Sequence, residues 1–464
     1  MRRFRSACLA LVSAAALGTV ASAARPHYGG TLRVEAAGVV RSLDPAVPAA
    51  DEAEAWIKTR IAPLVFETLT TVDGDAGVQP LLAASWESSG SRWRLRIRRN
   101  VVMHDESTLQ AWQVSAVLRA ANPAWTVDAD GDVVTVDHGP PDLLWQLAQP
   151  REGIAVRSSS GDLAGSGPFK LDRLADRRLM LHAHDRYWGS RPFLDAVQVE
   201  MGRSAADQLS SLERGGADVV SVRPTDARRL SQRGLRMAAS RPMETIALVF
   251  EAHRATGDYA VMRAALAAAI DRRALCDVLL QQRASPAAAL LPPWISGYAP
   301  LDAQVPSNIR ATVAGLPPAA RAVTVRVDPG DAVEQAIADR IVVDAHEAGL
   351  TISVQAPSGL APRPDVRIVR LPLEASSPDR VLAGVMAGLG ARVTALASAD
   401  AQVPAAGAPI EVVYSTERAL LEHQIIVPLV HMPDLYGLGD RVRSWNGPVL
   451  LAAGALNLAN IWIE

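Results

Sequence analysis

The chain has 464 residues, a formal net charge of −2 and an aromatic content of only 5%. A chain of this length buries most of the surface of its unfolded form and divides into two or more domains. The mildly acidic charge argues against a nucleic-acid-binding protein, which carries a clustered basic surface.

The first residues have the layout of a secretory signal peptide. Three arginines within the first five residues precede an apolar run over residues 7–20, and small residues follow at 21–23. We therefore predict a signal peptide over residues 1–23, cleaved near Ala23. A membrane anchor is the alternative, but the run of 14 apolar residues is shorter than the roughly 20 needed to cross a bilayer. Cleavage lowers the net charge from −2 to −5 and leaves Cys276 as the one cysteine, so the mature chain has no internal disulfide.

Strand-like and helix-like patterns alternate in the first half of the chain. Arginines recur at every second position from Arg92 to Arg98 with apolar residues between them, which is the period of a half-buried strand. We interpret these arginines as a solvated face, because a nucleic-acid surface would need basic helices or stacking aromatic residues beside them. Strands are predicted near residues 31–36, 92–98, 133–137, 167–171, 178–183 and 196–201, and helices near residues 52–68, 109–120 and 205–214.

The second half contains a clear βαβ pattern. Residues 323–327 alternate as a strand, Asp331 is placed to cap a helix, and Gly349 ends that helix before a strand at 351–354. Residues 365–371 and 378–388 repeat the strand and helix. The pattern predicts parallel strands joined by right-handed crossovers, in a mixed α/β fold.

Short segments spread over residues 28–440 match one family in type and order. The chain resembles the periplasmic solute-binding proteins of the peptide- and nickel-type ABC importers (family 5), as a divergent member. The segments are 28–34 (YGGTLRV) with 43–45, 64–70 (LVFETLT), 78–87 (VQPLLAASWE), 93–105, 165–171 (GSGPFKL), 187–189 (YWG), 263–271 (RAALAAAID), 427–431 (VPLVH) and 436–438 (YGL).

The resemblance implies a two-lobed fold of the type II periplasmic-binding-protein class. Each lobe would be a mixed sheet flanked by helices, and a two-strand hinge would join them. By analogy, residues 24–245 form lobe I with a reduced small subdomain, residues 246–425 form lobe II, and residues 426–464 return to lobe I. The crossings fall near residues 241–250 and 423–431. The family also implies a periplasmic monomer that binds a small solute or peptide and partners with inner-membrane permease subunits, without a cofactor or nucleic acid.

Candidate ligand-binding residues follow from family positions. A cleft holds a polar solute with aromatic groups and fixed charges, although packing or an ordinary surface role is the alternative at each position. The candidates are Arg41, Asp44, Phe66, Trp125, Arg151, Glu374 and Tyr436.

Catalytic and metal-binding patterns are incomplete. His182 and His184 stand two residues apart on a predicted strand before Asp185, but the segment lacks the further ligands of a metal site. The serine in 165–168 (GSGP) precedes a strand-like run, whereas a nucleophile elbow leads into a helix. We therefore expect a binding protein, with no catalytic residues and no metal.

One departure from the family concerns the ligand. Peptide-binding relatives carry a Trp-x-x-Asp segment whose aspartate meets the peptide amino group, but residues 368–374 contain neither residue. Glu374 is the one anion there that can substitute, and its alternative role is that of an exposed loop acid. We therefore expect a solute with an anionic or neutral polar group. Two functions remain open: an importer's solute-binding subunit, or an envelope sensor or interaction protein on the same fold.

The leader pattern makes a testable prediction about export. We expect the mature protein to begin within a few residues of Ala24, as read by N-terminal sequencing of a periplasmic fraction. A cytoplasmic protein that retains Met1 would contradict the prediction.

Overall fold

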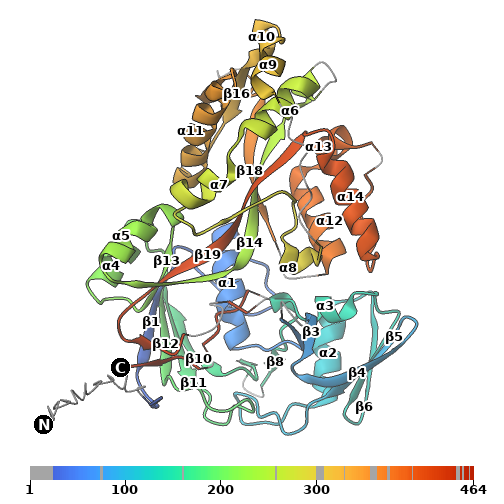
Figure 1. Cartoon of the computed structure of the whole chain (residues 1–464). Helices are drawn as coiled ribbons and strands as arrows, with labels where there is room; N and C mark the ends of the chain where they lie inside the picture. Colours follow the sequence, from blue (N-terminus) through green and yellow to red (C-terminus); the bar gives the residue numbers. More distant parts are fainter. Residues whose placement is uncertain are drawn as a thin grey trace, which may run out of the picture.

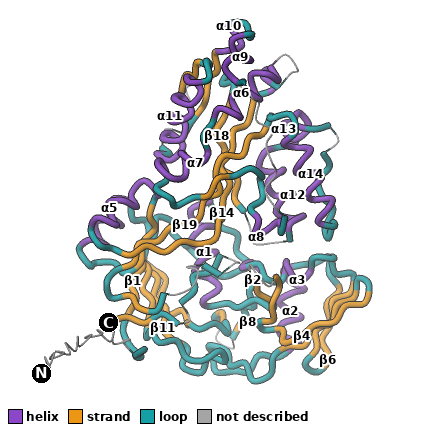
Figure 2. The backbone as a smooth tube through the Cα atoms, viewed as in Figure 1, coloured by secondary structure: helices purple, strands orange, loops and turns teal. Residues whose placement is uncertain are grey.

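The computed structural model places two lobes one above the other (Figure 1). It describes residues 25–464 except 74–76, 159–160, 256–258, 299–307, 329, 356–362, 374–376, 400, 446–449, 452–453 and 459. The predicted signal peptide therefore lies outside the described residues. The mixed α/β fold with sheets flanked by helices confirms the predicted fold class (Figure 2).

One sheet runs through both lobes, with the strand order β10-β11-β12-β1-β13-β19-β14-β18-β16-β17. In the lower lobe β1 (Thr31–Glu35) is parallel to β12 (Ala196–Glu200) and β13 (Val219–Val222). In the upper lobe β16 (Ala322–Arg326) is parallel to β17 (Thr351–Gln355) and β18 (Val366–Pro372). The remaining strands of this sheet in the lower lobe are β10 (Phe169–Ala175) and β11 (Arg178–Ala183). A short strand, β15 (Ser285–Pro286), also pairs with β19.

Two long antiparallel strands, β14 (Arg236–Phe250) and β19 (Ile426–Leu438), pass from one lobe to the other. Their pairing shifts in register on each side of the pair Pro242 and Pro433, and once more between Ile246 and Ala247. Proline has no backbone N–H, so two opposed prolines weaken the ladder of hydrogen bonds at this point. The sheet is therefore least constrained where β14 and β19 leave one lobe and enter the other.

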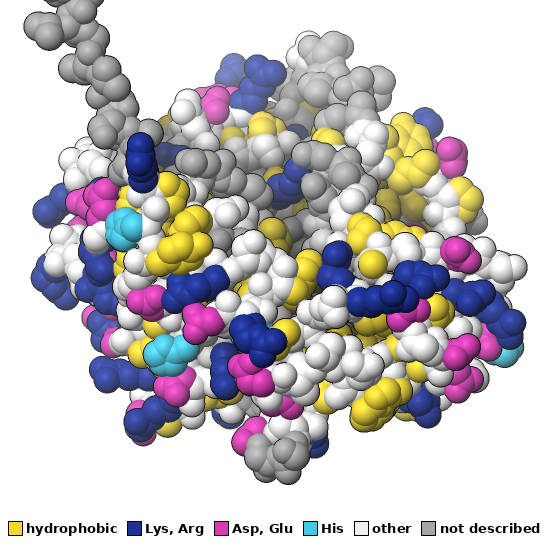
Figure 3. Space-filling model, turned by 90° about the horizontal axis from the view of Figure 1, so that it is seen from below, with side chains coloured by type: hydrophobic (Ala, Val, Ile, Leu, Met, Phe, Trp, Pro, Cys, Tyr) yellow, Lys and Arg dark blue, Asp and Glu magenta, His cyan; other side chains and the backbone are white. Residues whose placement is uncertain are grey.

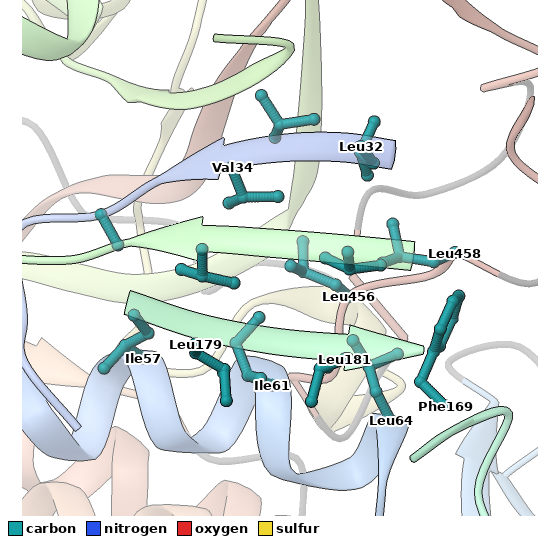
Figure 4. Close-up of a cluster of buried hydrophobic side chains, with 14 of the residues drawn as sticks. Leu32, Val34, Ile57, Ile61, Leu64, Phe169, Leu179, Leu181, Leu456 and Leu458 are labelled. Atoms are coloured by element: carbon teal, nitrogen blue, oxygen red, sulfur yellow. The ribbon is translucent and has the colours of Figure 1, made fainter. Parts of the chain in front are cut away.

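The core of the lower lobe lies between the sheet and α1 (Glu52–Ile61). Ile57 and Ile61 of the helix lie against Leu179 and Leu181 of β11, and all four are at most 1% exposed (Figure 4). The helix is shorter than the sequence predicted, because Pro63 starts a separate 3₁₀ turn, η1 (Ala62–Leu64), directly after it.

A small subdomain of the lower lobe has its own sheet and core. The strands β4 (Ala83–Ser89), β5 (Arg92–Ile97), β7 (Val133–Asp137) and β6 (Thr126–Asp130) pair in this order, with α2 (Ala111–Ala121) packed against them. Two of the alternating arginines lie on its exposed face: Arg92 pairs with Asp137, and Arg96 pairs with Asp132, to which the neighbouring Arg99 also binds. Cations and anions are interspersed over the face seen from below (Figure 3), which agrees with a solvated face.

The upper lobe has a core on each face of β14. Ile246, Leu248 and Phe250 face α6 (Ala260–Ala269) and α11 (Ala332–Glu347), whereas Ala247 and Val249 face α12 (Pro378–Leu389) and α14 (Ile410–Leu421). This alternation is the period of two of a strand buried on both sides.

The predicted βαβ unit is confirmed in the upper lobe as β16-α11-β17. Asp331 accepts hydrogen bonds from the backbone N–H groups of Val333 and Glu334, at 2.8 and 3.1 Å. Of the described residues, no single helix is long and apolar enough to cross a membrane; only α12 and α13 (Ala391–Ala397) together reach that length, and they are bent by 104°.

Three of the family-like segments meet at one buried carboxylate, Glu67. Its side chain accepts hydrogen bonds from Ser166 Oγ at 2.8 Å, Tyr187 Oη at 2.7 Å and Trp188 Nε1 at 2.8 Å. Burial raises the pKa of Glu67, while the bonds from Trp188, Tyr187 and Ser166 act in the opposite direction. The motif residues therefore fix the segments 64–70, 165–171 and 187–189 to one another.

Glycine is required beside this junction. A Cβ at Gly165 would lie 1.9 Å from the carbonyl oxygen of Val65, and a Cβ at Gly167 would lie 2.4 Å from that of Leu64. Any larger residue forces the backbone of the two segments apart.

This junction predicts a large cost for Glu67→Leu. The substitution leaves three donors without their acceptor, and each unsatisfied buried group costs about 1–3 kcal/mol. We expect the free energy of unfolding, measured by urea denaturation, to fall by about 3 kcal/mol or more. The exposed Glu87→Gln is the control and should leave stability unchanged. Equal stability of Glu67→Leu and the wild type would contradict the role of the junction.

Candidate functional site between the lobes

A pocket of about 330 Å³ lies where the small subdomain of the lower lobe meets the upper lobe. The lower wall comes from α3 (Leu143–Gln146), η2 (Pro150–Glu152) and the residues beside them, and the upper wall comes from the end of β18 and the start of α12. The carboxyl end of a parallel strand is where α/β sheets most often place ligands. The lining residues are Asp142, Gln146, Gln149, Arg151, Pro372, Arg380, Val381 and Gly384.

An ion pair joins the two walls. Arg380 donates from Nε to Asp142 at 2.7 Å and from Nη2 to the other carboxylate oxygen at 3.3 Å. Gln146 Nε2 also donates to this carboxylate, at 3.1 and 3.3 Å. The Asp142 side chain is 1% exposed and that of Arg380 is 44% exposed. The hydrogen bond to Asp142 raises the pKa of Arg380, which stays a cation at all ordinary pH values.

Arg151 is the second guanidinium of the pocket, and it is much less engaged. Its side chain is 63% exposed, and its Nε lies 3.6 Å from Glu152. Glu152 also accepts a hydrogen bond from Asn122 Nδ2 at 3.0 Å. Most of the donors of Arg151 therefore face the open pocket.

A separate network of charges lies at the crossing strands. Arg370 of β18 bonds Glu244 of β14 and, at 2.6 Å, Asp331 at the start of α11. On the lower side, Arg60 of α1 pairs with Asp434 of β19 and donates to Tyr436 Oη at 3.2 Å. Desolvation by burial raises the pKa of Glu244, and the cation of Arg370 opposes that shift. These ion pairs link both lobes to β14 and β19.

The predicted site residues lie in different places. Arg151 lines the pocket, and Trp125 packs partly buried against the core of the small subdomain. Arg41 pairs with Glu54 at 2.6 Å, and Asp44 accepts the backbone N–H of Ala46 at 2.9 Å.

Two further candidates, Phe66 and Tyr436, are 2% and 3% exposed in the core of the lower lobe, and Glu374 lies outside the described residues. A role of any of these residues in binding stays a prediction. Among the predicted residues that the structure describes, Arg151 alone lines the interlobe pocket.

Sequence reasoning missed the other polar lining residues. Asp142 and Arg380 are 238 positions apart, so no local pattern connects them. One signal was present: Arg380 stands in the first turn of a helix that follows a parallel strand, where α/β folds place ligand-binding groups.

The two histidines of the incomplete metal pattern separate in the structure. His182 is exposed on β11, 3.6 Å from Asp172, whereas His184 is buried with Nδ1 3.2 Å from the carbonyl oxygen of Gly167. The pair therefore presents no common set of ligands.

Comparison with known families matches residues 77–360 to the model of the bacterial extracellular solute-binding proteins, family 5 (middle region). Among curated proteins, an uncharacterized protein of Bacillus subtilis, YhjP, is 28% identical over 162 residues, which are 31% of this chain and 28% of that protein. The HTH-type transcriptional regulator SgrR of Escherichia coli K12 is 26% identical over 170 residues, 32% of this chain and 30% of that protein. The chain thus matches less than a third of the length of these curated relatives.

Solved structures share the fold over nearly the whole chain. An ABC transporter substrate-binding protein of Sinorhizobium meliloti has a TM-score of 0.73 and 19% identity, covering 94% of this chain and 100% of its own. NikA of Brucella suis, in complex with Fe(III)-EDTA, has a TM-score of 0.74 and 17% identity, with coverage of 94% and 100%. DppA of Helicobacter pylori, in complex with the peptide STSA, has a TM-score of 0.65 and 15% identity, with coverage of 95% and 99%.

The charge network at the crossing strands predicts a strong effect of Arg370→Met. Removing Arg370 leaves Glu244 and Asp331 without their cation; because the Arg370 and Glu244 side chains are 31% and 24% exposed, we expect a loss of about 1.5–3 kcal/mol, as for a hydrogen bond to a charged group. Urea denaturation should show that loss in the free energy of unfolding. The double variant Arg370→Met with Glu244→Gln should recover part of the lost stability. Arg92→Met removes an exposed arginine from a surface pair and should leave stability close to that of the wild type. Strictly additive losses for Arg370→Met and Glu244→Gln would contradict the coupling.

Proposed function

The chain belongs to the bacterial extracellular solute-binding proteins of family 5, and we propose that it captures a small polar solute between its two lobes for an ABC importer. The observation that carries the proposal is the polar pocket lined by residues of both lobes. A solute there contacts both walls at once, so it favours the conformation in which the lobes are closed. The change is a hinge motion, in which a few residues absorb a large change in backbone angles.

The hinge in this proposal is the irregular part of β14 and β19. The register of the two strands shifts between Ala239 and Pro242 and again between Pro242 and Glu244. The cores of the two lobes lie on either side of this part. The family implies lobe I at residues 24–245 with a return at 426–464 and lobe II at 246–425. Because Val427, Leu429 and Val430 pack in a core of the upper lobe, the proposed second crossing lies at Pro433 instead.

The pocket favours a solute rich in hydrogen-bond acceptors. Arg151 offers an exposed guanidinium, whereas the carboxylate of Asp142 is already shared by Arg380 and Gln146. An arginine holds a carboxylate through two parallel hydrogen bonds. A buried ammonium without a free carboxylate loses several kcal/mol of hydration, by order of magnitude. We therefore favour an organic acid or a neutral polar solute over a peptide bound by its free amine.

The proposed setting follows the family. The protein acts in the periplasm after removal of residues 1–23, as a monomer that delivers its solute to inner-membrane permease subunits. No cofactor or nucleic acid takes part, and the protein is not an enzyme.

A second candidate function is that of an envelope sensor or interaction protein on the same fold. One observation favours it: the matched part of this chain is also similar to a protein named as a transcriptional regulator. The fold is common to both functions, because function depends on the site and its partners. Loss of uptake of the bound solute on deletion of the gene supports transport; binding without any uptake defect supports the sensor.

A solute screen tests the main proposal. We expect an organic acid to reduce the radius of gyration in solution scattering. The same acid should stabilise the protein by about 2.7 kcal/mol at a hundredfold excess over its dissociation constant. Arg151→Gln should weaken binding about tenfold or more, because a hydrogen bond to a charged group contributes about 1.5–3 kcal/mol.

Arg186→Gln is the matched control and should bind normally, because Arg186 is about as exposed as Arg151 at 61%, pairs with Glu106 of the lower lobe and is not among the candidate binding residues. Tight binding of a free-amine peptide that is lost in Glu374→Ala would contradict the expected solute class. Stabilisation without compaction would contradict hinge closure.

A further inference from the structure

The ion pair between Asp142 and Arg380 joins the two lobes, and the proposed binding of solute by Arg151 does not involve it. Each group satisfies the other through two hydrogen bonds, and the Asp142 side chain is 1% exposed. Apart from the charges on β14 and β19 themselves, it is the one ion pair between the lobes within the described ranges. A solute that enters the pocket therefore finds Asp142 and Arg380 already bonded to each other.

The Asp142 side chain is held in place by its own lobe. Asp142 stands directly before α3, and Gln146 of that helix donates to its two oxygens. Arg380 lies in the first turn of α12, and its guanidinium is 44% exposed and bonds Asp142. The side-chain entropy lost when the pair forms is therefore mainly that of Arg380.

A second contact lies beside the ion pair. Gly407 of the upper lobe packs so closely on Pro141 that a Cβ at Gly407 would lie 2.6 Å from the Cβ of Pro141. The two lobes thus touch through adjacent residues of the lower lobe, Pro141 and Asp142. Separation of the lobes breaks both contacts.

We propose that the Asp142–Arg380 pair is a latch that stabilises the closed form of the solute-free protein, although the open form stays predominant until a solute binds, with Arg151 left free for the solute's anionic group. The latch regulates the same pocket and rests on the proposed function. It is reversible because Arg380, at 44% exposure, returns to water easily on opening, while Asp142 keeps the bonds from Gln146. Apparent affinity scales with the fraction of the protein that is already competent to bind, so the latch also sets the affinity for solute.

Fluorescence energy transfer in the solute-free protein tests the latch. Labels on Ser88→Cys and Arg392→Cys report the distance between the lobes, and the native thiol of Cys276 is buried. We expect Asp142→Asn to lower the closed-to-open ratio about tenfold or more, which is the loss of a charge-assisted pair. The charge swap Asp142→Arg with Arg380→Asp should restore much of the closed population.

A matched control is the ion pair of Glu213 with Arg229, which has the same two-bond geometry at 2.7 and 2.8 Å but lies within the lower lobe. Glu213→Gln should leave the closed-to-open ratio unchanged. Where a solute is in hand, Asp142→Asn should weaken its binding by the same factor as it lowers the closed-to-open ratio.

Unchanged energy transfer in Asp142→Asn would overturn the latch. A folded swap variant, by circular dichroism, that stays as open as Asp142→Asn would also overturn it. Either result leaves the proposed function intact if solute still compacts these variants. Conversely, a working latch in a protein that no solute compacts would reject the proposed function alone.

Discussion

The fold depends on the two strands, β14 and β19, that the lobes share. Ile246, Leu248 and Phe250 of β14 belong to the core of the upper lobe, whereas Tyr436 and Leu438 of β19 belong to that of the lower lobe. Between these cores the strands meet at two opposed prolines, where the ladder is weakest. In the proposed hinge motion the two lobes turn about this position, which changes the distance between the walls of the interlobe pocket.

The charged groups near the pocket and the crossing strands fall into two classes: those that pair with other charged groups of the protein, and those that are exposed to a solute. Arg60, Arg370 and Arg380 each bond a carboxylate, and the three pairs connect lobe to strand or lobe to lobe. The Arg60 pair is the most buried of the three and the costliest to break, whereas Arg370 and Arg380 are partly exposed. Arg151 alone, of the two guanidiniums in the pocket lining, keeps most of its donors exposed. The proposed preference for an anionic solute rests on that difference.

Local patterns in the sequence were enough to predict the elements and the family. The alternation of residues 323–327 and the cap at Asp331 predicted β16-α11-β17, because both signals lie within a few residues. Burial of single aromatics was not predictable: Phe66 and Tyr436 were candidates for the cleft, but a core aromatic and a binding aromatic look alike in sequence. Asp142 and Arg380 were not predicted, because they are 238 positions apart and come together only in the folded chain.

The most direct test of this account is a pair of crystal structures of the protein, one without solute and one with a solute found by screening. We predict that each lobe superposes on itself between the two structures. The change in backbone angles should be confined to β14 near Pro242 and β19 near Pro433. A solute bound between lobes whose relative orientation is unchanged, or a rearrangement within one lobe, would contradict the central claim that the two shared strands form the hinge of a solute-binding protein.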